Sequence, residues 1–225
     1  AVICLAALVV YREGLSSLKY DGRFVSLSFF GVIGMCLSPT LVFIGMSMSA
    51  AEHAVIIVSL QPSVTAIALW VMGKSRPNLF TIACIAAALV GVVLVVTKGK
   101  LAFDGSNRAL IGDFIVFAGA GAWVVYSLGV GRYAKLSTWR LTVLTMIPGC
   151  LATILITAVM VMYGDIQSPS MADYRSVGLE LAYLTFVGVF AALLAWNYGL
   201  RKVGALNATL LINLMPVTAF AYRSW

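Results

Sequence analysis

The sequence predicts an all-α, polytopic membrane protein. Of its 225 residues, 62% are hydrophobic and only 10% are charged, whereas soluble domains average about 45–50% apolar and about 25% charged residues. Apolar stretches recur along the chain, and each approaches the ~20 residues that a helix needs to cross a bilayer. Two of these stretches resemble each other and carry an internal proline at the same place, which indicates an internal repeat.

Seven complete spans are expected after a partial one. The opening run, residues 1–10, is about half a span long, and no basic region precedes it as in a signal peptide. We therefore interpret the chain as a fragment of a longer protein. The complete spans are expected at residues 25–48, 54–72, 79–97, 112–131, 139–163, 178–200 and 206–222. Their connections are short, apart from two polar segments at 98–109 and 163–176 that are rich in turn-forming residues.

The basic residues are distributed unequally between alternate connections. One set holds ten of the fifteen Lys and Arg residues: Arg12, Lys19, Arg23, Lys74, Arg76, Arg132, Lys135, Arg140, Arg201 and Lys202. The other set holds the remaining five, Lys98, Lys100, Arg108, Arg175 and Arg223, together with most of the acids. Because cytoplasmic loops of membrane proteins carry an excess of Lys and Arg, the first set is expected in the cytoplasm. The net charge of +7 therefore reflects topology, and no nucleic-acid partner is expected.

The repeat becomes visible when the chain is aligned with itself at an offset of 154 residues. Without a gap, Gly34 meets Gly188, Gly45 meets Gly199, Ala51 meets Ala205, Ala54 meets Ala208, Leu60 meets Leu214 and Pro62 meets Pro216. The second copy begins five spans after the first, and since five is odd it enters the membrane in the opposite direction. Inverted repeats whose sites lie near the midplane are typical of transporters. We expect Pro62 and Pro216 to break or kink their helices, because proline cannot donate the helical hydrogen bond, and to serve as gating points.

Three segments, "GDFIVFAGAGAWVVYSLGVGRYAK" (112–135), "LLAWNYGLRKVGALNATLLINLMPVTA" (193–219) and residues 51–96, resemble the EamA domains of the drug/metabolite transporter superfamily. The resemblance implies a ten-helix fold of two inverted five-helix halves. On that basis residues 1–100 are a first EamA repeat with a partial helix 2 and helices 3–5, and 101–111 are a linker. Residues 112–225 are then a second repeat that lacks helix 10. The segment "AWNYG" (195–199) is similar to the aromatic amino-acid exporters of the superfamily.

The candidate substrate-binding residues are uncharged, because no Asp, Glu, Lys or Arg lies in the core of an expected span. Gln61 and Asn213 neighbour the two prolines, and either bind substrate or form interhelical hydrogen bonds. Trp123 is central in its span, with Tyr126 on the same helix face, and lines a cavity or packs between helices. Trp196 and Asn197 complete the set, although Trp196 also suits an interfacial anchor.

These residues favour a secondary transporter that exports a small metabolite or amino acid by alternating access. Its expected partners are a metabolite, amino acid or drug-like substrate and the lipid bilayer, and its expected location is the plasma membrane, as in a bacterial inner membrane. A sugar-phosphate or nucleotide-sugar antiporter is the alternative, but it would need cavity cations to hold phosphate. A non-transporting membrane sensor is a further alternative.

An intramembrane enzyme has little to build on. The chain has one histidine, His53, and four cysteines, Cys4, Cys36, Cys84 and Cys150, that form no metal-binding or disulfide spacing. No catalytic residue, metal or cofactor is therefore expected. His53 lies at the edge of a span, where a helix-capping or loop contact is favoured over pH sensing. The substrate, the coupling ion and the oligomeric state stay open.

Overall fold

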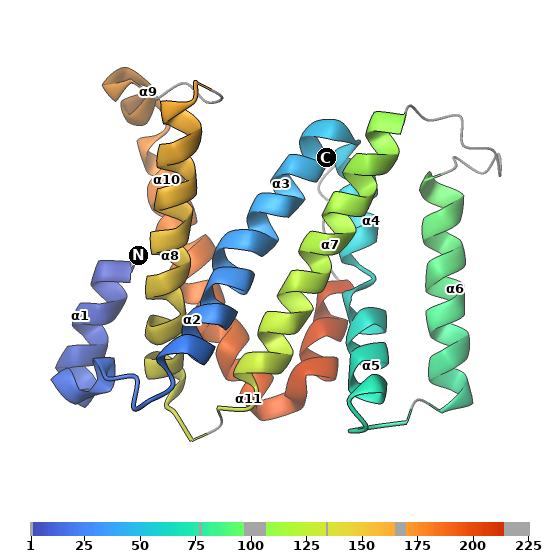
Figure 1. Ribbon diagram of the computed structural model, residues 1–225, viewed down its shortest axis with the longest axis horizontal. Coiled ribbons are helices and arrows are strands. Elements are labelled where there is room, and N and C mark those ends of the chain that lie inside the picture. The colour runs from blue at the N-terminus through green and yellow to red at the C-terminus, as the bar shows by residue number, and fades with distance from the viewer. Residues whose placement is uncertain (1, 77, 97–106, 134, 165–169, 214–225) are drawn as a thin grey trace. The chain divides into compact units, whose positions relative to one another are not determined.

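The computed structural model describes residues 2–76, 78–96, 107–133, 135–164 and 170–213, and this part of the chain is helical with turns and no strand. Five of its helical segments are long and apolar enough to cross a membrane, so the predicted all-α membrane fold is confirmed. The elements, shown in Figure 1, are α1 (Val2–Glu13), η1 (Leu15–Leu18), α2 (Phe24–Gly31), η2 (Val32–Leu37), α3 (Ser38–Met48), α4 (Ala51–Val58), α5 (Gln61–Val71), α6 (Leu79–Val96), α7 (Asn107–Val130), α8 (Thr138–Met162), α9 (Met171–Ser176), α10 (Gly178–Tyr183), η3 (Leu184–Ala191), α11 (Ala192–Leu210) and η4 (Leu211–Asn213).

The chain forms two compact units that are interleaved in the sequence. Unit 1 comprises residues 1–36 and 129–202, and unit 2 comprises residues 37–128 and 203–225. Each unit is therefore built from residues on both sides of the predicted linker, and we describe each by itself.

Unit 1 is organised around α8, against which α1, η1 and α2 pack. Gly31 of α2 lies directly on the backbone carbonyl of Thr145, where no Cβ would fit, so the two helices approach closely. Tyr20, in the connection between η1 and α2, donates a hydrogen bond of 3.1 Å to the carbonyl of Leu144. Burial raises the pKa of its phenol. The apolar centre of the unit includes Leu5, Val9, Leu27, Leu141 and Leu144.

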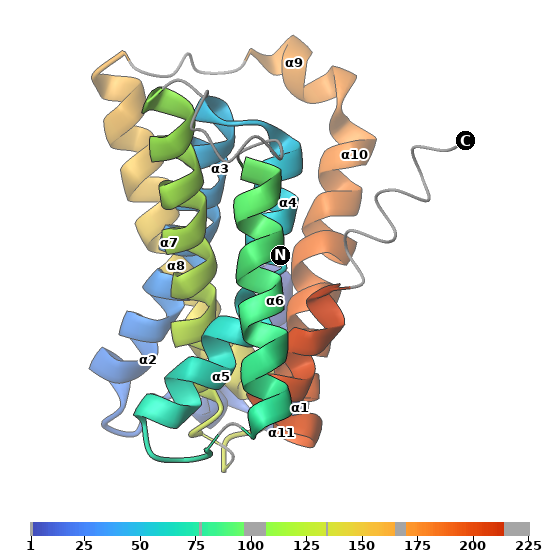
Figure 2. The ribbon, with the colours of Figure 1, turned by 90° about the vertical axis from the view of Figure 1, so that its right-hand side faces the viewer.

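Unit 2 is organised around α7, where small residues bring α3 into backbone contact. A Cβ placed on Gly45 would lie 2.5 Å from the carbonyl oxygen of Gly112, and one on Gly119 would lie 2.9 Å from that of Ser38. Ser38 in turn donates a buried hydrogen bond of 2.8 Å to the Gly119 carbonyl. Small residues allow such an approach in membrane helices, where packing rather than the hydrophobic effect drives association. Figure 2 shows α4 and α5 as separate helices beside α6.

The two copies of the sequence repeat share the same succession of local structures. Each contains a π-helical stretch, η2 in the first copy and η3 in the second, and these overlap when the offset of 154 residues is applied. Each then interrupts its helix at a matched place: at Ser49–Ala50 in the first copy and at Gly204 in the second, where φ is +81° and ψ is 164°. Gly204 suits this conformation because it has no Cβ. The repeat is thus visible in backbone geometry as well as in residue identities.

The predicted break before Pro62 is observed. Helix α4 ends at Val58 and α5 begins at Gln61, and Pro62 has no N–H to give to the Val58 carbonyl. Ser59 directly follows α4, and its hydroxyl donates a hydrogen bond of 2.6 Å back to the carbonyl of Ile56. In the second copy α11 gives way to the short helix η4 just before Pro216, which itself lies outside the described residues.

Several expected boundaries differ from the observed ones. Helix α7 begins at Asn107, five residues before the expected start of that span, so Asp113 lies inside the helix and not at its edge. The expected gap between the spans at 178–200 and 206–222 is reduced to the interruption at Gly204, where φ is +81°. Between α8 and that segment, Ser170 and Asp173 form a capping box at the start of α9. The Ser170 hydrogen bonds to the Asp173 carboxylate lower its pKa.

Candidate functional site

Three of the predicted site residues lie in unit 2, on α5 and α7. Gln61, the first residue of α5, is 5% exposed. Its side-chain nitrogen Nε2 lies 3.4 Å from the carbonyl oxygen of Ala120 on α7, which makes a long hydrogen bond. Because Trp123 follows Ala120 by three residues, it lies on the adjacent turn of the same helix face. The start of α5 therefore contacts α7 one turn before Trp123 in the sequence.

The aromatic residues of α7 form a pair. The ring centroids of Trp123 and Tyr126 are 5.3 Å apart, with the rings tilted by 40°. Tyr126 is fully buried, whereas Trp123 keeps part of its surface exposed. Ring pairs at such distances attract each other through dispersion and quadrupole interactions. Tyr126 therefore holds the indole in place, and Trp123 presents the accessible ring.

The side-chain oxygen of Gln61 is the unusual atom of this group. Oε1 is buried and has no hydrogen-bond partner among the described residues. A buried polar atom without a partner costs roughly 1–3 kcal/mol, so such atoms in folded proteins call for an explanation, which includes a role in function. An acceptor oxygen next to an indole ring is suited to a ligand that has both an N–H or O–H group and an apolar surface.

Two further predicted residues lie in unit 1, on α11. Asn197 is fully buried and donates a hydrogen bond of 2.9 Å from Nδ2 to the hydroxyl of Thr142 on α8. The Thr142 hydroxyl in turn donates a hydrogen bond of 2.7 Å to the carbonyl of Thr138. Trp196 is partly exposed. Asn197 therefore links α11 to α8, which is one of the two roles that a buried amide can have in a membrane helix.

The remaining predicted residues are described only in part. Asn213 ends η4, and its side chain lies outside the described residues, as does Pro216.

Two Arg residues, Arg201 of α11 and Arg140 of α8, form hydrogen bonds and an ion pair within unit 1. Arg201 donates to the carbonyl of Leu136 and to the hydroxyl of Thr138, and Arg140 binds Asp21 at 2.6 Å. These cations hold loops and helix ends together.

Sequence reasoning missed a polar cluster at the other end of α7, made of Ser49, His53 and Asp113. The Ser49 hydroxyl donates 2.5 Å to Oδ1 of Asp113, and Nδ1 of His53 lies 3.2 Å from Oδ2. Asp113 is 7% exposed. The helix-capping or loop contact was expected for His53, but its ring lies against a carboxylate inside α7, 60 residues away. The available signal was the apolar sequence before Asp113, which allows α7 to begin earlier.

The cluster does not have the arrangement of a nucleophilic triad. In a triad the histidine holds the serine with one ring nitrogen and the carboxylate with the other. Here Nδ1 faces both Asp113 and, at 3.4 Å, Ser49, while Ser49 donates directly to the carboxylate. This geometry fixes a carboxylate and does not activate a hydroxyl.

Comparison with known proteins decides the family. The model of the EamA-like transporter family matches residues 1–97 and 110–225 of the chain. The chain belongs to the EamA-like transporter family. As an EamA protein it is a multi-pass integral membrane protein, and its helices carry the exposed apolar side chains that such a location requires.

The EamA chain is also similar to individual proteins that are named as transporters. It is 30% identical to YrdR of Bacillus subtilis (strain 168) over 220 residues, which cover 96% of this chain and 68% of YrdR. It is 26% identical to YyaM of the same organism, over 96% of this chain and 70% of YyaM. A transporter of Archaeoglobus fulgidus is 26% identical over 95% of this chain and 71% of its own length.

A solved crystal structure shares the fold. It superposes with a TM-score of 0.64 at 19% sequence identity, covering 97% of this chain and 75% of the other. At this identity the similarity supports the architecture alone. The family match makes this protein a membrane transporter, which leaves its substrate and the direction of transport to be argued.

Proposed function

We propose that this protein is a secondary transporter that exports a small metabolite or amino acid by alternating access. Family membership supports the transport class. The buried Oε1 of Gln61, which has no partner among the described residues, and the aromatic pair on the helix that Gln61 contacts support the substrate class. A zwitterionic or amphipathic solute would give its N–H to Gln61 and lay its apolar part on the indole ring. No charged side chain is needed on the protein for this mode of binding.

The sugar-phosphate antiporter is less well supported. Phosphate recognition favours Arg or Lys side chains with unused donors, which bind its oxygens in pairs. Gln61 and Trp123 offer an amide and a ring instead. Arg201 of α11 and Arg140 of α8 already contact carbonyl, hydroxyl and carboxylate oxygens of unit 1. A neutral or zwitterionic solute therefore suits the described residues better.

Transport in sealed vesicles tests the proposal. The whole protein, reconstituted in proteoliposomes, is expected to exchange one or more members of a panel of radiolabelled amino acids across the membrane. A second assay tests whether cells that overexpress the protein tolerate toxic amino-acid analogues. If the vesicles show no flux of any panel member and the cells show no added tolerance, the proposed function is wrong.

Substitution of Gln61 tests the assigned site. Gln61→Leu keeps the volume but removes the acceptor, and the loss of one hydrogen bond to a bound solute should raise KM about tenfold. Thr65→Val is the matched control, because the Thr65 hydroxyl is buried one turn later and donates within its own helix to the Gln61 carbonyl at 2.7 Å. An equal rise of KM in both variants would show that Gln61 only packs.

A further inference from the structure

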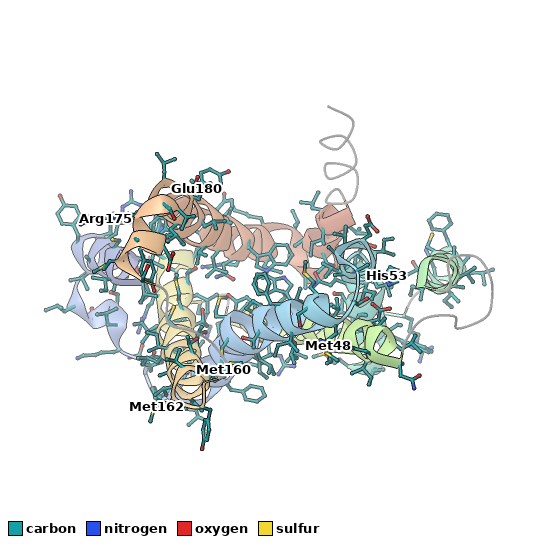
Figure 3. The ribbon with its side chains drawn as sticks, turned by 90° about the horizontal axis from the view of Figure 1, so that it is seen from above. Met48, His53, Met160, Met162, Arg175 and Glu180 are labelled. Carbon is teal, nitrogen blue, oxygen red and sulfur yellow. The ribbon has the colours of Figure 1, made fainter. Side chains whose placement is uncertain are left out.

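The cluster of Ser49, His53 and Asp113 joins three helices at one end of unit 2. Ser49 follows α3, His53 is in the first turn of α4, and Asp113 is in the second turn of α7. Figure 3 labels His53 on α4 and Met48 at the end of α3. Both oxygens of the Asp113 carboxylate are used, one by the Ser49 hydroxyl and one by the His53 ring.

Backbone packing explains why the carboxylate is held here. Gly112, the residue before Asp113, is buried against Gly45 of α3, and a Cβ on Gly112 would lie 2.8 Å from the Gly45 carbonyl oxygen and 2.9 Å from Cβ of Met48. The two helices thus touch at the point where Asp113 begins. The carboxylate therefore lies at the end of α3, within reach of the Ser49 hydroxyl and the His53 ring.

The electrostatic surroundings of the cluster are sparse. Among the described residues, α4 contributes one further charged group, Glu52, and α7 contributes Arg108; both are exposed. Helices α3, α5 and α6 contain no Asp, Glu, Lys, Arg or His. Their one titratable side chain is the exposed Cys84 of α6. His53 and Asp113 are therefore the two ionisable groups in contact, with side chains 13% and 9% exposed.

We propose that Ser49, His53 and Asp113 form a proton-binding site that fastens the ends of α3 and α4 to α7. With His53 neutral, the cluster carries one negative charge and Nδ1–H donates to the carboxylate. A proton from water then adds to the lone pair on Nε2, so the cluster becomes an imidazolium–carboxylate pair with no net charge. No other bond is made or broken.

Proton binding strengthens the attachment. Protonation adds a Coulomb attraction to the hydrogen bond, because the imidazolium and the carboxylate then carry opposite charges with Nδ1 and Oδ2 3.2 Å apart. Histidine is the side chain that changes charge between about pH 5 and pH 8. Acidification therefore strengthens the attachment of α3 and α4 to α7, and alkalinisation weakens it. The positive-inside distribution predicts that this end lies outside the cytoplasm, and we therefore expect external pH to be the signal.

Hydrogen exchange tests the site without any substrate. The whole protein in lipid nanodiscs is labelled at about pH 5 and about pH 8, with rates corrected for intrinsic exchange. We expect the backbone of residues 45–54 to exchange about fivefold faster at the higher pH, the change that corresponds to one charge-assisted bond. His53→Asn and Asp113→Asn should lose this dependence, while Glu52→Gln, the neighbouring exposed acid, should keep it. A pH-independent wild type, or its loss in Glu52→Gln as well, overturns the proposal.

A second measurement covers the case in which the variants fail to fold. His53 is the single histidine of these 225 residues, and ring-labelled histidine gives an NMR signal of His53 that reports its protonation. In the wild-type protein this signal and the exchange of residues 45–54 should change over the same pH range, and changes over different ranges would overturn the site. Neither measurement involves solute flux, so this inference and the proposed transport function fail or hold separately.

Discussion

Buried amides in this protein have two different roles, which their hydrogen bonds distinguish. Asn197 in α11 gives its Nδ2 to Thr142 at 2.9 Å and is fully buried. Gln61 makes one long contact and keeps an acceptor without a partner in the described region. We infer that Asn197 holds helices together, whereas Gln61 meets the solute.

The structural role of Asn197 leads to a stability prediction. Asn197→Ala should leave the Thr142 hydroxyl without its donor inside unit 1, and the loss should destabilise the protein by about 1–3 kcal/mol. Asn207→Ala is the control, because Asn207 is exposed and its Nδ2 donates to the carbonyl of Val203, four residues earlier in the sequence. Thermal unfolding in detergent measures both. Equal melting temperatures for the two variants would contradict the structural role.

At the scale of single residues, the sequence allowed local relations to be predicted and missed distant ones. The Trp123–Tyr126 pair follows from helical spacing, since residues three apart share a face. The contact of His53 with Asp113 does not, because 60 residues separate them and each reads as a loop or edge residue. The unpartnered oxygen of Gln61 likewise depends on how α5 lies against α7, which no spacing rule provides.

Helix interruptions in this protein depend on more than proline. Pro148 lies inside α8, which continues unbroken to Met162, whereas α4 and α5 are separated just before Pro62. A ring in a helix removes one hydrogen bond in both cases. A hydroxyl three residues before the proline donates to a carbonyl of its own helix in both cases, from Ser59 and from Thr145, so this bond does not explain the difference. Proline positions therefore predicted where a break is permitted, and not whether it occurs.

The contact of α3 with α7 gives a prediction at the scale of elements. Gly112→Ala would place a Cβ 2.8 Å from a backbone oxygen of α3, so the helices must separate, at a cost of about 1–3 kcal/mol. Gly121→Ala, on the same helix, meets nothing within 4 Å and should gain up to about 1 kcal/mol of helix propensity. Thermal unfolding of the two variants should therefore change in opposite directions. A neutral Gly112→Ala would show that the two helices are not in contact in the membrane.

The two stretches matched by the family model do not coincide with the two compact units of the structure. The family match treats residues 1–97 and 110–225 as successive stretches, while each compact unit takes residues from both of them. Both copies of the repeat pass from one unit to the other, the first between residues 36 and 37 and the second between 202 and 203. The first crossing lies within the π-helical stretch η2, and the second lies in α11 after η3. A repeat that contributes to both units is a suitable basis for alternating access, because a bend in either copy acts on both.

Alternating access requires a defined orientation, which the charge distribution predicts. Lys74 belongs to the basic set that is expected in the cytoplasm, and Arg175 belongs to the opposite set; both are exposed. In a variant whose native cysteines are replaced by serine, Arg175→Cys should react with a membrane-impermeant thiol reagent in intact cells, and Lys74→Cys should not. Both should react once the cells are permeabilised, which controls for reactivity. Labelling of Lys74→Cys alone in intact cells would reverse the orientation and place the His53–Asp113 cluster on the cytoplasmic side, where it would respond to internal and not external pH.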